Sequence, residues 1–379
     1  MPRAGQTATA LGARLPQRVV LGLLIRSFPP THVDRILDTL GRREQRQRLL
    51  PARLMVYFTL GMWIFGSHSY EEVLAEILRG VPGLTTHPAT HPPDGVTATA
   101  AAIGRARRRL GVDPLRLLFE DVAGPAEQVA PDPLLPGCRR TLRLSVVAVD
   151  VPDTNANRIE FGDRPREAAF PGPAFPQAQL SLLIDDRTHR VVAAALDDGS
   201  ERPPLRALAG SMTPGTLLVM DERPFSAALW SAVADLGCDQ LWTVPDGLDL
   251  PVHMRLPDGS RLSRLPGPDG SARRTVRVVA RPSFCLVTSV LDYRAAPAER
   301  LLAVYDRYRA SGHGFEGISV YQGGDRLVLR SKSPDLVRQE LYAMLCVHHT
   351  IGELVDYTLL DKFSPSAENG RPSGPVDTL

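Results

Sequence analysis

Apolar residues recur every three to four positions in the first part of the chain, which is the spacing of one buried helix face. Four such segments follow one another, and prolines and glycines lie at their starts and ends, as Pro30, Pro51 and Gly80 do. The pattern predicts helices over 15–28, 30–41, 51–66 and 69–80, and a further helix over 98–111. Two proline-rich loops, 81–97 and 124–137, interrupt and end this helical part.

From residue 141 the apolar positions alternate or run continuously, which is typical of strands buried in a sheet. The predicted strands are 141–150, 178–186, 189–198, 216–222 and 239–245, with helices at 203–210 and 226–237. Residues 246–297 are strand-like, with turns at 257–260 and 266–271, and a long closing helix starts at Pro334 after Ser333. This order predicts an α/β fold: an RNase H-like core interrupted by an all-β insertion and preceded by an all-α N-terminal domain.

The length of 379 residues suits two or three domains. We divide the chain into a helical, basic N-terminal domain (1–122), a linker (123–140), a second domain (141–363) with its β-rich insertion at about 246–297, and a disordered tail (364–379). No apolar run approaches the roughly 20 residues that span a bilayer. The four cysteines are far apart, which predicts reduced thiols in a cytoplasmic protein with no membrane partner.

Charge is distributed unevenly along the chain, although the formal net charge is only +2. The first sixty residues hold ten arginines against three acidic residues, so the rest of the chain is mildly acidic. A basic segment suits an anionic partner such as nucleic acid, although a solvated helix face has the same composition. The candidate phosphate contacts are the N-terminal arginines Arg42, Arg43, Arg46 and Arg48, followed by Arg105, Arg107, Arg108 and Arg109.

Two aspartates lie where predicted buried strands end: Asp150 closes "VVAVD" in the strand 141–150, and Asp221 closes "LLVMD" in the strand 216–222. Ligands of open α/β sheets collect beyond the carboxyl ends of the strands. Two carboxylates there can bind Mg²⁺, and paired metal ions promote phosphodiester cleavage. Either aspartate alone is equally typical of a turn or a helix cap.

Five blocks in order resemble the DDE transposases of the insertion sequence 4 family, over roughly 14–363. They are 43–80, 147–162 ("VAVDVPDTNANRIEFG"), 217–230 ("LLVMDERPFSAALW"), 256–265 and 327–345. The resemblance implies an RNase H-like catalytic domain, cut-and-paste DNA transposition, double-stranded DNA with inverted-repeat ends as substrate, Mg²⁺ as cofactor and a homodimer on DNA. It makes Asp150 the first metal ligand and Asp221 the second, and adds Asn157 and Lys332 as candidate DNA contacts. Because "VDVPDT" is shorter than in the family, Asp153 competes with Asp150.

The family's third carboxylate is missing from its expected place. Its signature of Tyr, Arg, Glu and Lys falls here on Tyr305, Tyr308, Gly312 and Ser319, so only the tyrosine is kept. Glu316 lies one helical turn after Gly312 and is the candidate substitute. The sequence therefore predicts a DNA-binding protein derived from a transposase, with impaired catalysis. The alternatives are an active transposase that uses Asp150, Asp221 and Glu316, and a protein-interaction module that binds no DNA.

Overall fold

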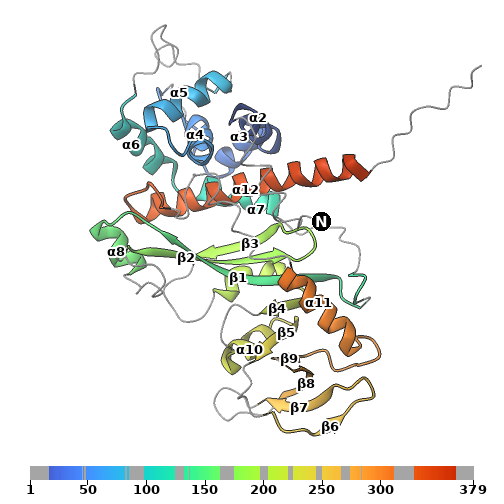
Figure 1. The fold of residues 1–379 in the computed structure, drawn as a ribbon. Helices are drawn as coiled ribbons and strands as arrows, with labels where there is room; N and C mark the ends of the chain where they lie inside the picture. Colours follow the sequence, from blue (N-terminus) through green and yellow to red (C-terminus); the bar gives the residue numbers. More distant parts are fainter. Residues whose placement is uncertain are drawn as a thin grey trace, which may run out of the picture.

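The computed structural model describes residues 17–44, 46, 48–81, 83–84, 98–123, 132–135, 137–162, 175–196, 204–220, 225–244, 250–265, 274–282, 284–310 and 328–363. Its N-terminal helices form one layer, and the long C-terminal helix α12 (Pro334–Phe363) runs between that layer and a sheet (Figure 1). Further strands extend the same sheet away from the helices (Figure 1). The predicted mixed α/β class is confirmed.

The helical layer contains every helix that the apolar periodicity predicts for the N-terminal part. Its members are α2 (Gln17–Ser27), α3 (Pro30–Thr39), α4 (Ala52–Ile64), α5 (Tyr70–Gly80) and α6 (Ala100–Leu110), whereas α7 (Asp113–Ala123) lies beside α12 and also packs against the sheet (Figure 1). Helix α4 is buried on nearly all sides, as its almost wholly apolar sequence requires. Helix α5 begins with a capping box in which the Ser69 side chain accepts from Glu72 N and Glu72 accepts from Ser69 N. We did not predict α7.

The helical layer and the sheet share one hydrophobic core. Helix α12 packs against α2, α4 and α7, and its buried residues Val337, Leu341 and Leu345 lie in that core. The core also includes Val149, Leu180 and their neighbours on one face of the sheet. The N-terminal helices are therefore held to the sheet by α12.

The described strands form one nine-stranded sheet in the order β3-β2-β1-β4-β5-β9-β8-β7-β6. The first five strands in sequence are β1 (Arg140–Asp150), β2 (Gln177–Asp185), β3 (Val191–Leu196), β4 (Thr216–Met220) and β5 (Asp239–Val244). β2 is antiparallel to β1 and to β3, whereas β4 runs parallel to both β1 and β5. Because β1 and β4 are parallel neighbours, their carboxyl ends point the same way.

The central strands bury different residues on their two faces. On β4, Leu218 and Met220 lie in a core with the helices α9 (Leu205–Leu208) and α10 (Ala227–Ala234). Leu217 and Val219, on the other face, lie in a core with α11 (Ala298–Ala310). A short helix α8 (Asn155–Phe161) follows β1, and the 3₁₀ turn η2 (Ala209–Ser211) follows α9.

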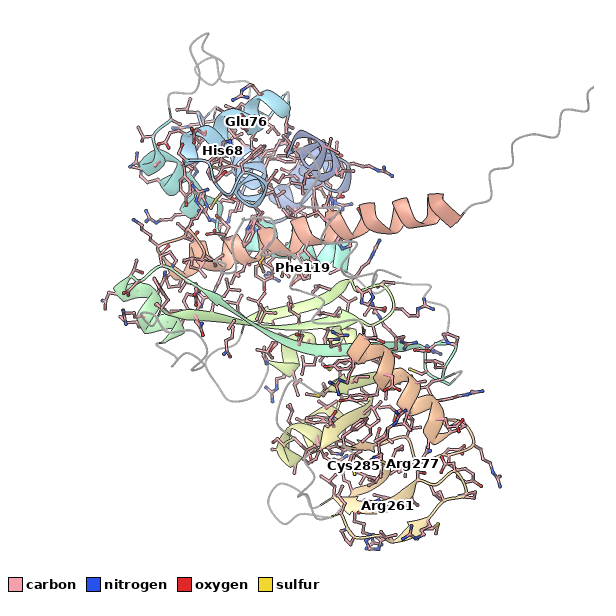
Figure 2. The ribbon with its side chains drawn as sticks, viewed as in Figure 1. His68, Glu76, Phe119, Arg261, Arg277 and Cys285 are labelled. Atoms are coloured by element: carbon pink, nitrogen blue, oxygen red, sulfur yellow. The ribbon has the colours of Figure 1, made fainter. Side chains whose placement is uncertain are left out.

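The segment predicted as β-rich contains four described strands: β6 (Met254–Arg255), β7 (Arg261–Leu265), β8 (Arg274–Arg281) and β9 (Phe284–Thr288). They are joined antiparallel, and β9 pairs with β5. Arg277 lies within this part of the sheet (Figure 2), where its buried guanidinium pairs with Asp258 and donates to Ala296 O at 2.6 Å. The hairpins thus have a polar anchor of their own.

None of the helices in the described part of the chain has the length and apolar character needed to cross a membrane. The four cysteines are free thiols, three of them buried and Cys285 half-buried. Burial raises the pKa of Cys238 to about 11, so this thiol stays protonated at neutral pH.

Candidate nucleic-acid interface and predicted metal site

A cavity of about 430 Å³ opens in the helical layer, where the segment between α3 and α4 meets the end of α6. Half of the ten residues lining it are arginines, and one is acidic. They are Arg42, Arg43, Arg46, Arg48 and Arg109, with Glu44 as the acid. We call these five arginines and their cavity the arginine pocket. It brings together all four N-terminal arginines predicted as phosphate contacts and one from α6.

Glu44 is held by the helix that follows it. Its two carboxylate oxygens accept from Ala52 N, at 3.0 and 2.9 Å, at the N-terminus of α4. A carboxylate in this position offsets the positive end of the helix dipole. Glu44 also lies 3.5 Å from the Arg109 guanidinium. The only acid in the lining is therefore engaged, and the pocket keeps an excess of positive charge.

The arginines of the pocket differ in how far they are tied to the protein. Arg42 donates to Arg109 O at 3.2 Å, and Arg109 donates to Leu50 O at 2.6 Å. Arg43 donates to Asp38 at 2.9 Å, and this hydrogen bond raises its pKa. Arg46 and Arg48 are exposed, and neither has a hydrogen bond or ion pair to another described residue. These two guanidinium groups are available to an anion from solution.

The α6 arginines fall into two groups. Arg105, Arg108 and Arg109 are exposed, whereas Arg107 is completely buried. Arg107 donates to the side chains of Gln339 at 2.8 Å, Ser331 at 3.1 Å and Tyr70 at 3.1 Å, and to Leu336 O at 3.3 Å. Its guanidinium joins α5, α6 and α12. Because it does not face solvent, the prediction that Arg107 contacts DNA is wrong.

Of the two other predicted DNA contacts, one is buried and one is exposed. Asn157 is completely buried, and its amide donates to Pro152 O at 3.0 Å and Ser331 O at 3.3 Å. This amide fixes the start of α8 to the chain before α12, so it does not face solvent. Lys332 is exposed.

The first predicted metal ligand, Asp150, is the last residue of β1 and is buried. Its Oδ1 accepts from Gln177 Nε2 at 2.8 Å, and its carbonyl accepts from Leu329 N at 2.9 Å. The competing Asp153 is exposed and paired with Arg158, which lowers the pKa of Asp153. Each aspartate is thus engaged by a neighbour rather than grouped with other acids.

The remaining predicted ligands, Asp221 and Glu316, lie outside the described residues, as do Gly312 and Ser319. Within the described residues, no three His, Cys, Asp or Glu side chains are grouped so that they could hold a metal ion. The described carboxylates therefore do not fit a two-metal site, and we derive no catalytic step through one.

A cluster of buried charges lies between α11 and the start of β1, and we had not predicted it. Arg307 of α11 contacts the carboxylates of Asp132, at 2.5 Å, and Asp186, at 2.8 Å. Arg143 of β1 lies 3.5 Å from Asp186, donates to Tyr308 O at 2.9 Å and stacks over the Tyr308 ring. These five residues are the α11 ion cluster. They come from four separate segments of the sequence, so no spacing pattern could have pointed to them.

The chain is similar to known proteins, both in its N-terminal helices and along most of its length. Residues 18–120 match the family model of the insertion element 4 transposase N-terminal domain. The transposase InsG of insertion sequence element IS4 from Escherichia coli (strain K12) is 26% identical over 344 residues, which cover 85% of this chain and 74% of that protein. A piggyBac transposase synaptic complex with hairpin DNA aligns over 92% of this chain and 77% of its own, with 11% identity and a TM-score of 0.44.

The helical layer and the arginine pocket lie almost entirely within the matched N-terminal domain, because the model spans 18–120. The similarity to the IS4 transposase extends well beyond that domain. The N-terminal helices therefore match the insertion element 4 transposase N-terminal family, and 85% of the chain is similar to an IS4 transposase.

Proposed function

We propose that this transposase relative binds double-stranded DNA through the arginine pocket, with inverted-repeat-like ends as its sites. The observation that carries the proposal is the gathering of five arginines around one cavity with a single, already engaged carboxylate. Arginine guanidinium groups bind phosphate oxygens in a planar, bidentate manner. The exposed Arg105, Arg108 and Lys332 extend the proposed contact surface.

The proposal includes an architecture. The order β3-β2-β1-β4-β5, with β4 and β5 parallel to β1, supports an RNase H-like core, and β6–β9 are its β-rich insertion. We divide the chain into a DNA-binding domain (1–122), a linker (123–140), the core (141–363) and a tail (364–379). We also propose that the protein acts in the cytoplasm and as a homodimer on DNA, the second of which its resemblance to the transposase family implies.

A gel-shift experiment tests the DNA contact. We expect the double variant Arg46→Ala/Arg48→Ala to bind mixed-sequence duplexes at low salt at least about tenfold more weakly than the wild type, because it loses two phosphate contacts. The matched control is Arg206→Ala, which removes an exposed arginine from α9, on the sheet rather than in the helical layer. Wild-type protein that retards no duplex even at low salt would instead support a protein-interaction module.

We further propose that DNA cleavage is impaired, because the position of the family's third carboxylate is occupied by Gly312. A supercoiled plasmid carrying inverted-repeat ends, incubated with Mg²⁺ or Mn²⁺, is expected to be nicked no faster by wild type than by Asp221→Ala. Nicking by the wild type that disappears in Asp221→Ala would establish an active transposase. Loss in Glu316→Gln as well would identify Glu316 as the third ligand.

A further inference from the structure

The pairing of β1 with β4 shows which part of β1 lies beside the end of β4. The two strands are parallel, and Arg143 lies opposite Val219. Met220, the last residue of β4, therefore lies beside Leu144, and Ser145 is the next residue along β1. Asp221, which lies outside the described residues, is the next residue of the chain after Met220.

Asp150 is distant from the part of β1 that lies beside the end of β4. It lies five residues beyond Ser145, which is about 16 Å along a strand. The pairing of β1 with β2 is continuous from Leu142 to Asp150, so no bulge shortens this distance. Two carboxylates that share metal ions about 4 Å apart cannot start from such separated positions.

Ser145 and Asp150 also lie on opposite faces of β1. Side chains alternate along a strand, so Arg143 and Ser145 share one face, and Leu144 and Asp150 share the other. Arg143 contacts Tyr308 of α11, whereas Leu144 lies in the core with Leu218 and Met220. On β4 the odd-numbered residues Leu217 and Val219 face α11. Ser145 thus belongs to the α11 face, and Asp150 does not.

We infer that Ser145 occupies the position from which β1 would supply a metal-binding carboxylate at the end of β4, and that Asp150 is a structural residue. This inference rests on the proposed function only in taking the end of β4 as the place of the family's metal site. A hydroxyl there supplies no negative charge, so the chain lacks a β1 ligand as well as the carboxylate replaced by Gly312.

The α11 ion cluster supports this assignment. On the face where a cation site would need free carboxylates, the described acids Asp132 and Asp186 are both held by Arg307, and Asp186 also lies near Arg143. Both carboxylate side chains are almost completely buried, with exposed fractions of 2% and 0%. Arginine supplies the charge compensation here, so these acids are not left for a divalent ion.

Disulfide trapping in the full-length chain tests the inference. Cysteines join when their Cα atoms are about 4.4–6.8 Å apart. We expect Ser145→Cys/Asp221→Cys to form a disulfide on mild oxidation, located by peptide mass spectrometry, and Asp150→Cys/Asp221→Cys not to form one. Circular dichroism under reducing conditions checks that both variants fold. A 150–221 disulfide, or the absence of a 145–221 disulfide in folded protein, would overturn the inference.

Metal binding gives a second measurement that does not depend on new cysteines. Asp150→Asn is expected to bind Mn²⁺ as the wild type does in an electron paramagnetic resonance titration. A loss of about tenfold or more in Mn²⁺ affinity would identify Asp150 as a ligand and overturn the inference. Neither experiment involves the arginine pocket, so failure of DNA binding would refute the proposed function separately.

Discussion

Arg107 and Arg108 are adjacent on α6 but have opposite surroundings. Arg108 is exposed, whereas Arg107 is completely buried and donates to partners on α5, on α12 and in the segment before α12. The run of arginines in the sequence hides this difference, because a basic cluster does not show which member faces inward. Burial and partners, rather than residue type, separate an anchor from a candidate DNA contact.

We expect Arg107→Ala to lower the free energy of unfolding by about 3 to 5 kcal/mol. The buried acceptors of Gln339, Ser331 and Leu336 lose their donor, and each unsatisfied group costs about 1–3 kcal/mol. Urea unfolding followed by circular dichroism measures the change. Arg108→Ala is the matched control and should change stability by less than about 0.5 kcal/mol. Equal effects of the two substitutions would contradict the assignment.

At the scale of elements, α11 is held to β1 by charge as well as by apolar packing. Leu301, Val304 and Tyr305 pack on the odd-numbered side of β4, and Arg307 binds Asp132 and Asp186. Burial raises the pKa of Asp132, but hydrogen bonds from Arg307, Leu134 N and Thr141 outweigh it, so the pKa lies below its usual value. The ionised carboxylate therefore stabilises the fold.

Arg307→Ala should lower the free energy of unfolding by about 3 to 5 kcal/mol at pH 7, because it leaves the buried Asp132 carboxylate without its cation and Asp186 with Arg143 alone. The pKa of Asp132 is lower in the folded state, so its contribution is present above the unfolded pKa and is lost as pH falls through the folded value. The difference in the free energy of unfolding between variant and wild type should accordingly become smaller below about pH 4. Denaturant unfolding at pH 7 and pH 3 measures it, with exposed Arg309→Ala as control. A free-energy difference that does not change with pH would contradict the stabilising role of the ion pair between Arg307 and Asp132.

Sequence patterns predicted most elements because apolar periodicity reflects burial directly. Helix α4 and strand β1 are examples, and both lie within one or two residues of their predicted bounds. The predicted pairing of Asp150 with Asp221 depended instead on the register between two strands, which periodicity does not contain. The α11 ion cluster joins Asp132 to Arg307 across 175 positions, so it too required the tertiary structure.

At the scale of the whole molecule, the arginine pocket and the end of β4 belong to separate layers. The pocket lies in the helical layer, whereas β4 is a central strand of the sheet, and α12 runs between the two layers (Figure 1). The proposed DNA binding by the arginine pocket therefore does not depend on the proposed chemistry at the end of β4. In the proposed function, phosphate contacts supply the affinity for DNA, and such contacts carry no sequence information by themselves.

The salt dependence of DNA binding tests this central claim most directly. Fluorescence anisotropy of a labelled duplex, titrated at several salt concentrations, gives the slope of log affinity against log salt. Each phosphate contact adds about 0.9 to the slope, so Arg46→Ala/Arg48→Ala should reduce it by roughly 1.8 relative to the wild type. An unchanged slope and affinity in the double variant would show that the arginine pocket is not where this protein holds DNA.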